Sequence, residues 1–505
     1  MTDSRLFPDY TSVLLPRMLS AIDRDPFSET RGCADRSFWG WKTKDFPDAT
    51  LSRIALLLHQ IDPQKYQNEI LWVLEFLRKI QHRDGSFDQA FPNEHSHGAT
   101  AFLLHDLAEI MLSEPSLLDS FGDILEKNGH YLIKYRETHG QISNHIAGTA
   151  AALFGLWKLT KDARYRKTAE DYLHLVLQNQ SAEGWYPEYG GADPSYQTLC
   201  IDYLASCYEI TKQELLLSSL KKAISFVSYF AHPDGSFGGE YGSRNCEIFY
   251  PGGIAVLSKY LSEASSLLAW ATQSFSKSKT VTPLSVDLEN LSPLFSSILQ
   301  AEKVASTNAA DRQSNLLPGD QQPFVQDFPE AGIYIVNQDI CYSILSWKKG
   351  GIVKSFDKKA KKKVVDDCGI ILLKNNRNVA TSQFFSQNHT FQTDETTVKM
   401  QLATFITHQQ QPTPFRFFLL RLLNLTFWRF RCIREAGKKY LVSLLISNRK
   451  QTPFYAERTI DFGADIPKIS DRLTGGGTKT GNLEIISGKK FSSIHMASSK
   501  YYYET

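Results

Sequence analysis

Gly140-Gln141-Ile142-Ser143-Asn144-His145 is a polar stretch that runs directly into an apolar helical pattern at residues 146–156. A second polar stretch, residues 184–196, begins at Gly184, ends at Tyr196 and leads into another helical pattern in the same way. An amide, an imidazole and a phenol therefore stand just before two predicted helix starts. Loops in such positions hold reactive side chains on a rigid scaffold.

Similar polar loops recur along the first half of the chain, at a spacing of about fifty residues. Their glycines are Gly85, Gly140, Gly184 and Gly235, and residues 31–48 fit as an earlier member. Helical periodicity on both sides of each loop predicts hairpins of helices, which stack into a solenoid or close into an α/α toroid. We expect a toroid over residues 1–275, in which equivalent loops share one mouth. The alternative is that turns of the Asp-Gly type only join helices.

The pattern changes in the second half of the chain. Short runs of β-type residues, separated by glycine turns, lie at 332–336, 341–345, 369–373 and 440–446. They predict an antiparallel β-sandwich over residues 330–505. Residues 276–329 are rich in Ser, Thr, Asn, Gln and Pro and contain one apolar helical piece at 291–299, which indicates a partly ordered linker. Residues 415–430 are strongly apolar but carry three arginines, which favours a helix or strand pair of the β-domain over membrane contact.

Composition excludes several classes of function. The net charge of the 505-residue chain is +2, so no nucleic-acid partner is indicated. The seven cysteines form no CxxC pair, which argues against a zinc module and a disulfide framework and fits reduced thiols in a cytoplasm. The first residues lack the charged and apolar regions of a signal peptide. No apolar run approaches the ~18 residues of a membrane span. We therefore expect a cytoplasmic protein.

Candidate ligand-contacting residues lie in the repeated loops. In the first loop, Arg36, Trp39 and Trp41 combine a cation with indole faces, which stack on sugar rings, although a capping segment with buried tryptophans explains them equally well. His95 and His97 lie in the second loop. Because the chain has no HxxxH or HExxH pattern there, they indicate substrate contact rather than a metal site.

The later loops add further polar and aromatic side chains. The candidates are Trp185, Glu188 and Tyr189 in one loop and Tyr241, Arg244 and Glu247 in the next. The glycines around Arg244 allow tight backbone paths. An Arg244–Glu247 ion pair that only orders the loop is the structural alternative to ligand contact.

Taken together, Asn144-His145 before a helix, Tyr196 about fifty residues later, the helical repeats and the trailing β-sandwich resemble the heparinase II/III-like and alginate-lyase-like polysaccharide lyases. The resemblance implies a toroid that carries the site and a β-domain that closes over it. It places the family's carboxylate-neutralising pair on Asn144 and His145 and its catalytic tyrosine on Tyr196. Many members carry a His-rich stretch in the β-domain that binds zinc. Here residues 387–394 hold only His389, so we expect no metal and no other cofactor.

The chemistry of β-elimination suits these residue types. Removing the C5 proton of a uronic acid is easier when an amide and an imidazole stabilise the charge on its carboxylate, the roles of Asn144 and His145. A phenol with a pKa of ~10 needs nearby positive charge before it can take the proton, which Arg244 or His145 would give Tyr196. Tyr241 and Arg244 would assist from the adjacent loop. The expected partner is therefore an oligo- or polysaccharide that contains uronic acid.

Three rival functions stay open at this point, besides a C5-epimerase that returns the proton to the opposite face. A glycoside hydrolase would need two carboxylates at the mouth, drawn from Asp84, Asp88, Glu188 and Glu240. A terpenoid-cyclase-type toroid is suggested by residues 81–87, but the chain lacks the acid motif and that group does not explain the β-domain. A non-catalytic glycan-binding protein would keep the aromatic mouth without a working base.

Overall fold

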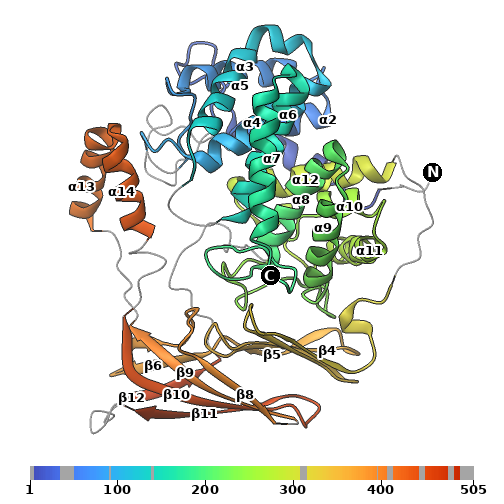
Figure 1. The fold of residues 1–505 in the computed structure, drawn as a ribbon, viewed down its shortest axis with the longest axis vertical. Helices are drawn as coiled ribbons and strands as arrows, with labels where there is room; N and C mark the ends of the chain where they lie inside the picture. The colour runs from blue at the N-terminus through green and yellow to red at the C-terminus, as the bar shows by residue number, and fades with distance from the viewer. Residues whose placement is uncertain are drawn as a thin grey trace.

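The computed structural model describes residues 5–34, 51–89, 92–137, 142–306, 315–394, 396–406, 413–442, 450–475 and 483–488. Within them, helices make up the first part of the chain and two antiparallel sheets most of the second (Figure 1). The predicted fold class, an α/α toroid followed by an antiparallel β-domain, is confirmed.

The helical part closes into a ring. Its helices are α1 (Thr11–Ala21), α2 (Leu51–Ile61), α3 (Gln67–Ile80), α4 (His97–Ser113), α5 (Ser116–Lys134), α6 (Ser143–Thr160), α7 (Ala163–Gln178), α8 (Pro194–Thr211), α9 (Glu214–Ser228), α10 (Gly252–Leu257), α11 (Ser262–Ser276) and α12 (Leu288–Ser306). Helices α2, α4, α6, α8, α10 and α12 contact one another in that order, and α12 returns to α2. Helices α4, α6 and α8 are buried on nearly all sides, whereas α3, α5, α7 and α9 bury one face, as expected for inner and outer layers.

Glutamines and glycines fix the spacing between successive hairpins. The Gln81 amide donates to the Ile124 carbonyl of the next hairpin at 3.0 Å, and Gln180 donates to Ser219 in the same way at 2.9 Å. Four residues after Gln81, Gly85 has φ +91°, and a Cβ there would lie 2.0 Å from the Lys127 carbonyl oxygen. The motif at residues 81–87 that suggested a cyclase therefore has a structural role in the repeat.

The second part consists of two stacked sheets (Figure 1). The five-stranded sheet runs β1 (Phe324–Phe328), β2 (Ile333–Asn337), β3 (Cys341–Ser346), β4 (Ile352–Asp357) and β5 (Lys362–Asp367) in sequence order. The seven-stranded sheet is ordered β11 (Lys468–Gly475), β10 (Gln451–Asp461), β9 (Thr397–Ile406), β7 (Arg377–Thr381), β6 (Ile370–Lys374) and β12 (Leu483–Ser487), with β8 (Thr390–Asp394) paired to β9.

The central strands of the five-stranded sheet, β2, β3 and β4, are buried on both faces because they lie between the toroid and the larger sheet. One face joins the toroid core through Phe328, Tyr342 and Phe356, and the Tyr342 hydroxyl donates to the Tyr229 carbonyl at 2.7 Å. The other face packs on the seven-stranded sheet in a separate core that includes Leu345. The β-domain is therefore fixed against the loop end of the toroid.

Two segments differ from the sequence-based interpretation. Residues 276–329, interpreted as a linker, contain α12, which closes the ring of inner helices, so the helical part extends beyond residue 275 to Ser306. The run at 440–446, predicted as a strand, begins inside helix α14 (Arg431–Val442), and residues 443–446 lie outside the described part. Its β-type residues follow a helix that has already started at Arg431, and propagating a helix is easier than starting a new element.

A helical hairpin is inserted between β9 and β10. It consists of α13 (Pro414–Leu425), a short 3-10 turn and α14, and it stands beside the toroid above the seven-stranded sheet (Figure 1). The apolar run at 415–430 is thus helical, as one of the two expected forms. Among the described residues no helix has the length and apolarity needed to cross a membrane.

Candidate functional site

Three loops of successive hairpins meet at one end of the toroid. Ile142 pairs with Glu188 in an isolated β-bridge, and the Ser143 hydroxyl donates to the Pro187 carbonyl at 2.6 Å. From the next loop, the Ser243 hydroxyl donates to the Glu188 carbonyl at 2.8 Å. The loops before α6, before α8 and before α10 therefore form one mouth, at which Glu188 is the common contact.

Glu188 is the centre of this mouth. Its carboxylate is buried, accepts a hydrogen bond from the Asn144 amide at 2.8 Å and lies 3.3 Å from the Arg244 guanidinium. Burial raises the pKa of Glu188, Arg244 and His145 lower it, and the net pKa is about 7. Glu188 can therefore exchange a proton near neutral pH, which an ordinary glutamate does not do.

Arg244 covers two tyrosines. Its guanidinium carbon lies 4.4 Å from the ring centre of Tyr189 and 4.8 Å from that of Tyr196. Asp193 fixes this arrangement, because it caps α8 by accepting from the Tyr196 backbone N–H at 3.0 Å and accepts from the Arg244 backbone N–H at 2.8 Å. One buried carboxylate thus fixes the backbone of Arg244 relative to that of Tyr196.

His145 is held by a carboxylate of its own. Its Nδ1 lies 3.0 Å from a Glu137 oxygen, and the ring packs edge-on against Phe102 with centres 5.3 Å apart. Burial lowers the pKa of His145, but the Glu137 and Glu188 carboxylates outweigh burial, so the net pKa is raised. The imidazole is 21% exposed, so a ligand can reach it.

A cavity of about 390 Å³ lies next to His145, between α4, α6 and α7. Glu137, His97 and Arg136 line it, and the His97 Nε2 atom pairs with the Tyr172 hydroxyl at 3.1 Å. His97 is buried, and burial lowers its pKa to about 4. The structure therefore places His97 beside the mouth as a neutral ring.

Tyr241 and Glu247 lie apart from this cluster. The Tyr241 ring is fully buried against Phe230, and its hydroxyl pairs with His232 Nε2 at 2.7 Å. Glu247 lines a separate cavity of about 190 Å³ under the last loop. The ion pair that the structure shows for Arg244 is with Glu188.

The remaining candidates have local partners. His95 Nδ1 pairs with Asp84 and Ser86 at 2.8 and 2.7 Å, and the Trp185 indole donates to Glu183 at 2.8 Å. These contacts order the second and fourth loops. The candidates of the first loop, Arg36, Trp39 and Trp41, lie outside the described residues.

Lys349 and Glu137 reach the mouth without having been selected from the sequence. The Lys349 ammonium, from the turn between β3 and β4, donates to the Gly242 carbonyl and to the Asn245 side chain in the Arg244 loop. Burial lowers its pKa to about 8. A glycine turn about a hundred residues from the mouth has no local signal for this role, because tertiary packing alone brings it there. Glu137 lies just before the Gly140 stretch. Its spacing to His145 matches no known motif, so the sequence did not indicate that the two side chains pair.

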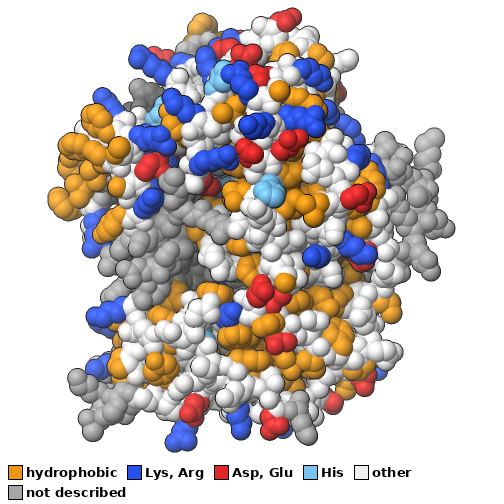
Figure 2. Space-filling view, in the orientation of Figure 1, with side chains coloured by type: hydrophobic (Ala, Val, Ile, Leu, Met, Phe, Trp, Pro, Cys, Tyr) orange, Lys and Arg blue, Asp and Glu red, His pale blue; other side chains and the backbone are white. Residues whose placement is uncertain are grey.

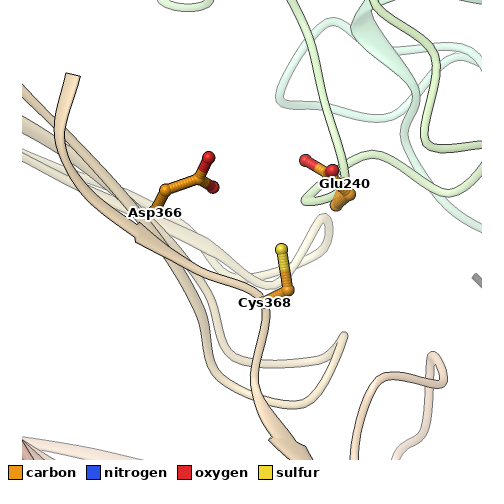
Figure 3. A group of neighbouring side chains, drawn as sticks. All are labelled: Glu240, Asp366 and Cys368. Atoms are coloured by element: carbon orange, nitrogen blue, oxygen red, sulfur yellow. The ribbon is translucent and has the colours of Figure 1, made fainter. Parts of the chain in front are cut away.

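One group of described residues has the atoms of a metal site, Glu240, Asp366 and Cys368, with those atoms within 4.8 Å of one another (Figure 3). The Lys354 ammonium lies among them, 2.6 Å from Glu240 and in contact with Asp366 and Cys368. Lysine thus supplies the cation. Burial also raises the pKa of the Cys368 thiol to about 12, which disfavours the thiolate that a metal requires.

His389 does not fit the zinc site of the resembling lyases. Its Nε2 atom donates to the Phe384 carbonyl at 3.0 Å, and its Nδ1 atom accepts from the Ala403 N–H at 3.1 Å. The ring is buried, which lowers its pKa to about 4. Both nitrogens therefore hold the β-domain loop through backbone hydrogen bonds. Neither is directed at a metal position.

Comparison with known proteins finds structures of similar fold but no protein of similar sequence. No protein-family model matches the sequence, and no curated protein matches it. Among solved structures, chondroitin AC lyase from Streptomyces coelicolor A3, solved with chondroitin sulphate, aligns over 79% of this chain and 67% of its own, with 11% identity and a TM-score of 0.51.

Two further solved structures align with this chain. Heparinase III aligns over 89% of this chain and 67% of its own, with 12% identity and a TM-score of 0.46. Unsaturated glucuronyl hydrolase from Bacillus sp. GL1 aligns over 55% of this chain and 87% of its own, with 12% identity and a TM-score of 0.40. With its closed ring of helices and its stacked antiparallel sheets, the chain has a polysaccharide-lyase-like fold.

Proposed function

We propose that the protein is an enzyme that cleaves a uronic-acid-containing glycan by β-elimination, with Tyr196 as the base. The observation that carries this proposal is the Arg244 guanidinium 4.8 Å from the Tyr196 ring, because a fixed cation favours the phenolate form of a tyrosine. The likeness in fold to a lyase solved with chondroitin sulphate supports a glycan as substrate.

The proposed reaction needs one proton acceptor and one proton donor. Tyr196 takes the C5 proton of the uronate, the C4–O bond breaks, and a double bond forms between C4 and C5. The leaving oxygen then receives a proton from the Tyr196 phenol or from Tyr189, which lies under the same guanidinium. The products are a new chain end and an unsaturated uronate, so atoms and charge balance without a cofactor.

The carboxylate of the substrate needs positive charge or donors around it. In this proposal His145 provides them through Nε2, since its Nδ1 faces Glu137, and the net pKa of the ring is raised. Asn144 gives one amide hydrogen to Glu188 and has a second amide hydrogen for the substrate. Both groups stabilise the enolate-like state in a partly buried setting, where such donors are most effective.

Ultraviolet absorbance of the unsaturated uronate tests the proposal across a panel of uronic-acid polysaccharides, with the Tyr196→Phe protein as blank. We expect absorbance to rise with the wild-type protein on at least one glycan. Cleavage that produces new reducing ends without the chromophore would contradict elimination. Deuterium uptake at C5 without cleavage would instead indicate a C5-epimerase.

A glycoside hydrolase is the second candidate, because Glu188 has a pKa of about 7. A carboxylic acid that is protonated at neutral pH is what the general acid of a hydrolase requires. On this reading Glu188→Gln would abolish cleavage, no unsaturated product would form, and Tyr196→Phe would have little effect. The same pair of variants thus separates the two reactions.

We also propose a reducing, cytoplasmic setting. The cysteines are free, and apart from the exposed Cys432 they are buried, as expected for thiols that were never selected to form disulfides.

A further inference from the structure

The inserted hairpin, α13 with α14, exposes an unusual amount of apolar surface. Figure 2 shows hydrophobic side chains gathered at the edge of the molecule where the hairpin lies. The exposed apolar side chains are Phe415, Phe417, Phe418, Leu419, Leu422, Leu425, Phe427, Phe430, Ile433 and Tyr440. Phe415 is 71% exposed, and Phe418 and Phe430 are each 63% exposed. Patches of this kind mark interaction sites in soluble domains.

The hairpin is also strongly basic. Residues 413–442 carry seven Lys or Arg side chains and one Glu, a net charge of +6 in a protein whose net charge is only +2. Arg416 and Arg421 lie on α13 among the exposed phenylalanines, and Arg429 and Lys439 are exposed nearby. An apolar surface set among cations matches a partner that is negatively charged outside and apolar beneath.

The side that faces the toroid is already occupied. The Asn93 amide donates to the Asn424 carbonyl at 3.0 Å, and the Arg431 guanidinium lies 4.2 Å from the ring centre of Tyr135. These contacts hold the hairpin next to the loop end of the toroid. The exposed phenylalanines and leucines of α13 therefore lie on surface that the described part of the toroid leaves uncovered.

The distribution around α13 favours a bilayer over a protein groove. Phe417, Phe418 and Leu419 are consecutive, so they point in different directions around the helix, and all three are exposed. A groove would cover one narrow stripe, whereas the acyl chains of a bilayer can accommodate the broad apolar surface that α13 exposes away from the toroid. At ~1.5 Å per residue, the 12 residues of α13 are too short for the ~30 Å core of a bilayer, so the helix would lie in the interface.

We propose that the α13–α14 hairpin docks the protein on an anionic phospholipid surface, with the phenylalanines and leucines of α13 among the acyl chains and its arginines at the phosphates. This fits the proposed cytoplasmic setting, since the inner leaflet is negatively charged. It is independent of the chemistry at Tyr196. Docking would hold the mouth of the toroid close to the membrane, where a membrane-associated glycan would be within reach.

Cys432 gives a test without any substitution. It is exposed on α14, and the other cysteines are buried, so the native protein can be labelled there with an environment-sensitive fluorophore. Vesicles of phosphatidylcholine with phosphatidylglycerol should raise and blue-shift the fluorescence, and pure phosphatidylcholine vesicles should do so much less. No change with either kind of vesicle would overturn the proposal.

Flotation of the full chain with the same vesicles tests the residues. Phe415→Ser with Phe418→Ser should lower the partition coefficient roughly tenfold or more, since both changes remove apolar surface from contact with the acyl chains. Arg416→Glu with Arg421→Glu should abolish the preference for anionic vesicles. The melting temperature of both double variants should stay close to that of the wild type, which shows that they fold.

Matched controls exist elsewhere on the surface. Phe27 is 94% exposed and Leu215 is 66% exposed, so Phe27→Ser with Leu215→Ser removes similar apolar surface from the toroid. Lys359→Glu with Lys362→Glu removes positive charge from the lysine-rich run at residues 358–363, at the turn from β4 into β5. Equal loss of flotation in these controls would overturn the proposal. Self-association would also overturn it. In that case sedimentation would show that the wild-type chain is an oligomer held together by the hairpin, that the Phe415→Ser, Phe418→Ser variant is a monomer, and that the wild-type oligomer does not bind vesicles.

Discussion

The guanidinium of Arg244 and the ring of Tyr196 face each other, with the Arg244 Cζ atom 4.8 Å from the ring centre. The two residues come from successive hairpins, and Asp193 accepts a backbone N–H from each. The same guanidinium lies 3.3 Å from Glu188. One fixed cation therefore influences both the proposed base and the carboxylate that titrates near neutrality.

Tyr196→Phe should remove nearly all turnover, a loss of about 10²–10⁴-fold, the usual contribution of a positioned acid or base. Only one hydroxyl is lost, so the melting temperature and glycan binding should change little. Tyr189→Phe is the comparison variant, because its ring lies under the same guanidinium and its phenol is the alternative proton donor. Initial rates of unsaturated product measure both. Wild-type rates in Tyr196→Phe, with loss in Tyr189→Phe, would transfer the role to Tyr189.

Asn144→Ala should raise the barrier by about 2.7–4 kcal/mol, the scale for loss of one donor to a developing oxyanion. The structure adds a second effect, because the variant also removes the amide that donates to Glu188. Losing this amide raises the pKa of Glu188 further, so a limb of the pH profile of kcat that Glu188 controls should move to higher pH. A lower rate with an unchanged pH profile would restrict Asn144 to the substrate carboxylate.

The pH dependence of stability should reveal Glu188. Its pKa is raised to about 7 when folded, so the folded state binds the extra proton and wild-type stability falls as pH rises from about 4.5 to about 7. Glu188→Gln resembles the protonated form and should lack this fall. The difference between the two proteins should reach roughly 3 kcal/mol across that window, measured by urea unfolding.

Glu209→Gln is the control of opposite sign. Burial raises the pKa of Glu209, but bonds from Lys212 and Tyr260 outweigh burial and lower it. Its contribution to stability is therefore present above the pKa of the unfolded chain and is lost as pH falls. Parallel pH profiles for the two variants would refute the assignment of the window to Glu188.

The fold could be predicted because its signals are local. Apolar periodicity, the spacing of Gly85, Gly184 and Gly235, and the short β-type runs each follow from the residues themselves. Helix α12 was not recognised as the closing helix, since its polar surroundings resemble a linker and only its contacts with α2 and α10 show its place. The strand prediction was wrong at residues 440–442, because there the β-type residues continue a helix that has already begun.

The candidate site could be predicted only in part. Asn144, His145, Tyr196 and Arg244 were found from polar loops before helices, and the structure brings them together with Glu188. Tyr241 looked equivalent in sequence but is buried against His232. Lys349 comes from the other domain, where nothing local distinguishes it from a turn lysine. Whether such a lysine reaches the mouth depends on how the two domains pack, and local sequence patterns hold no information about that packing.

Glu137→Gln should move the alkaline limb of kcat/KM to lower pH. The Glu137 carboxylate is the main group that raises the pKa of His145 against the effect of burial. The imidazolium is therefore present below that raised pKa and is lost as pH rises through it, and without Glu137 it is lost earlier. Steady-state kinetics over a pH series measure the shift. An unmoved limb would show that the charge on His145 plays no part in the reaction.

Gly98→Ala should act on the same imidazole from the other side. A Cβ at Gly98, in the first turn of α4, would lie 2.6 Å from the His145 Nδ1 atom, the atom that faces Glu137. The ring must move, so the variant should lose activity and show the alkaline shift of Glu137→Gln. Gly122→Ala is the control, because its Cβ would lie 3.4 Å from Leu118, an ordinary contact, and it should stabilise α5 by about 0.5–1 kcal/mol.

Combining the two changes tests whether they share one mechanism. If Gly98→Ala works by separating His145 from Glu137, adding Glu137→Gln to it should cost little more, and the two effects on kcat/KM should be strongly non-additive. Full additivity would mean that the alanine disturbs α4 in general and not the imidazole. Thermal unfolding of each single variant separates these outcomes, because a general disturbance lowers the melting temperature of Gly98→Ala whereas displacement of a partly exposed ring leaves it near that of the wild type.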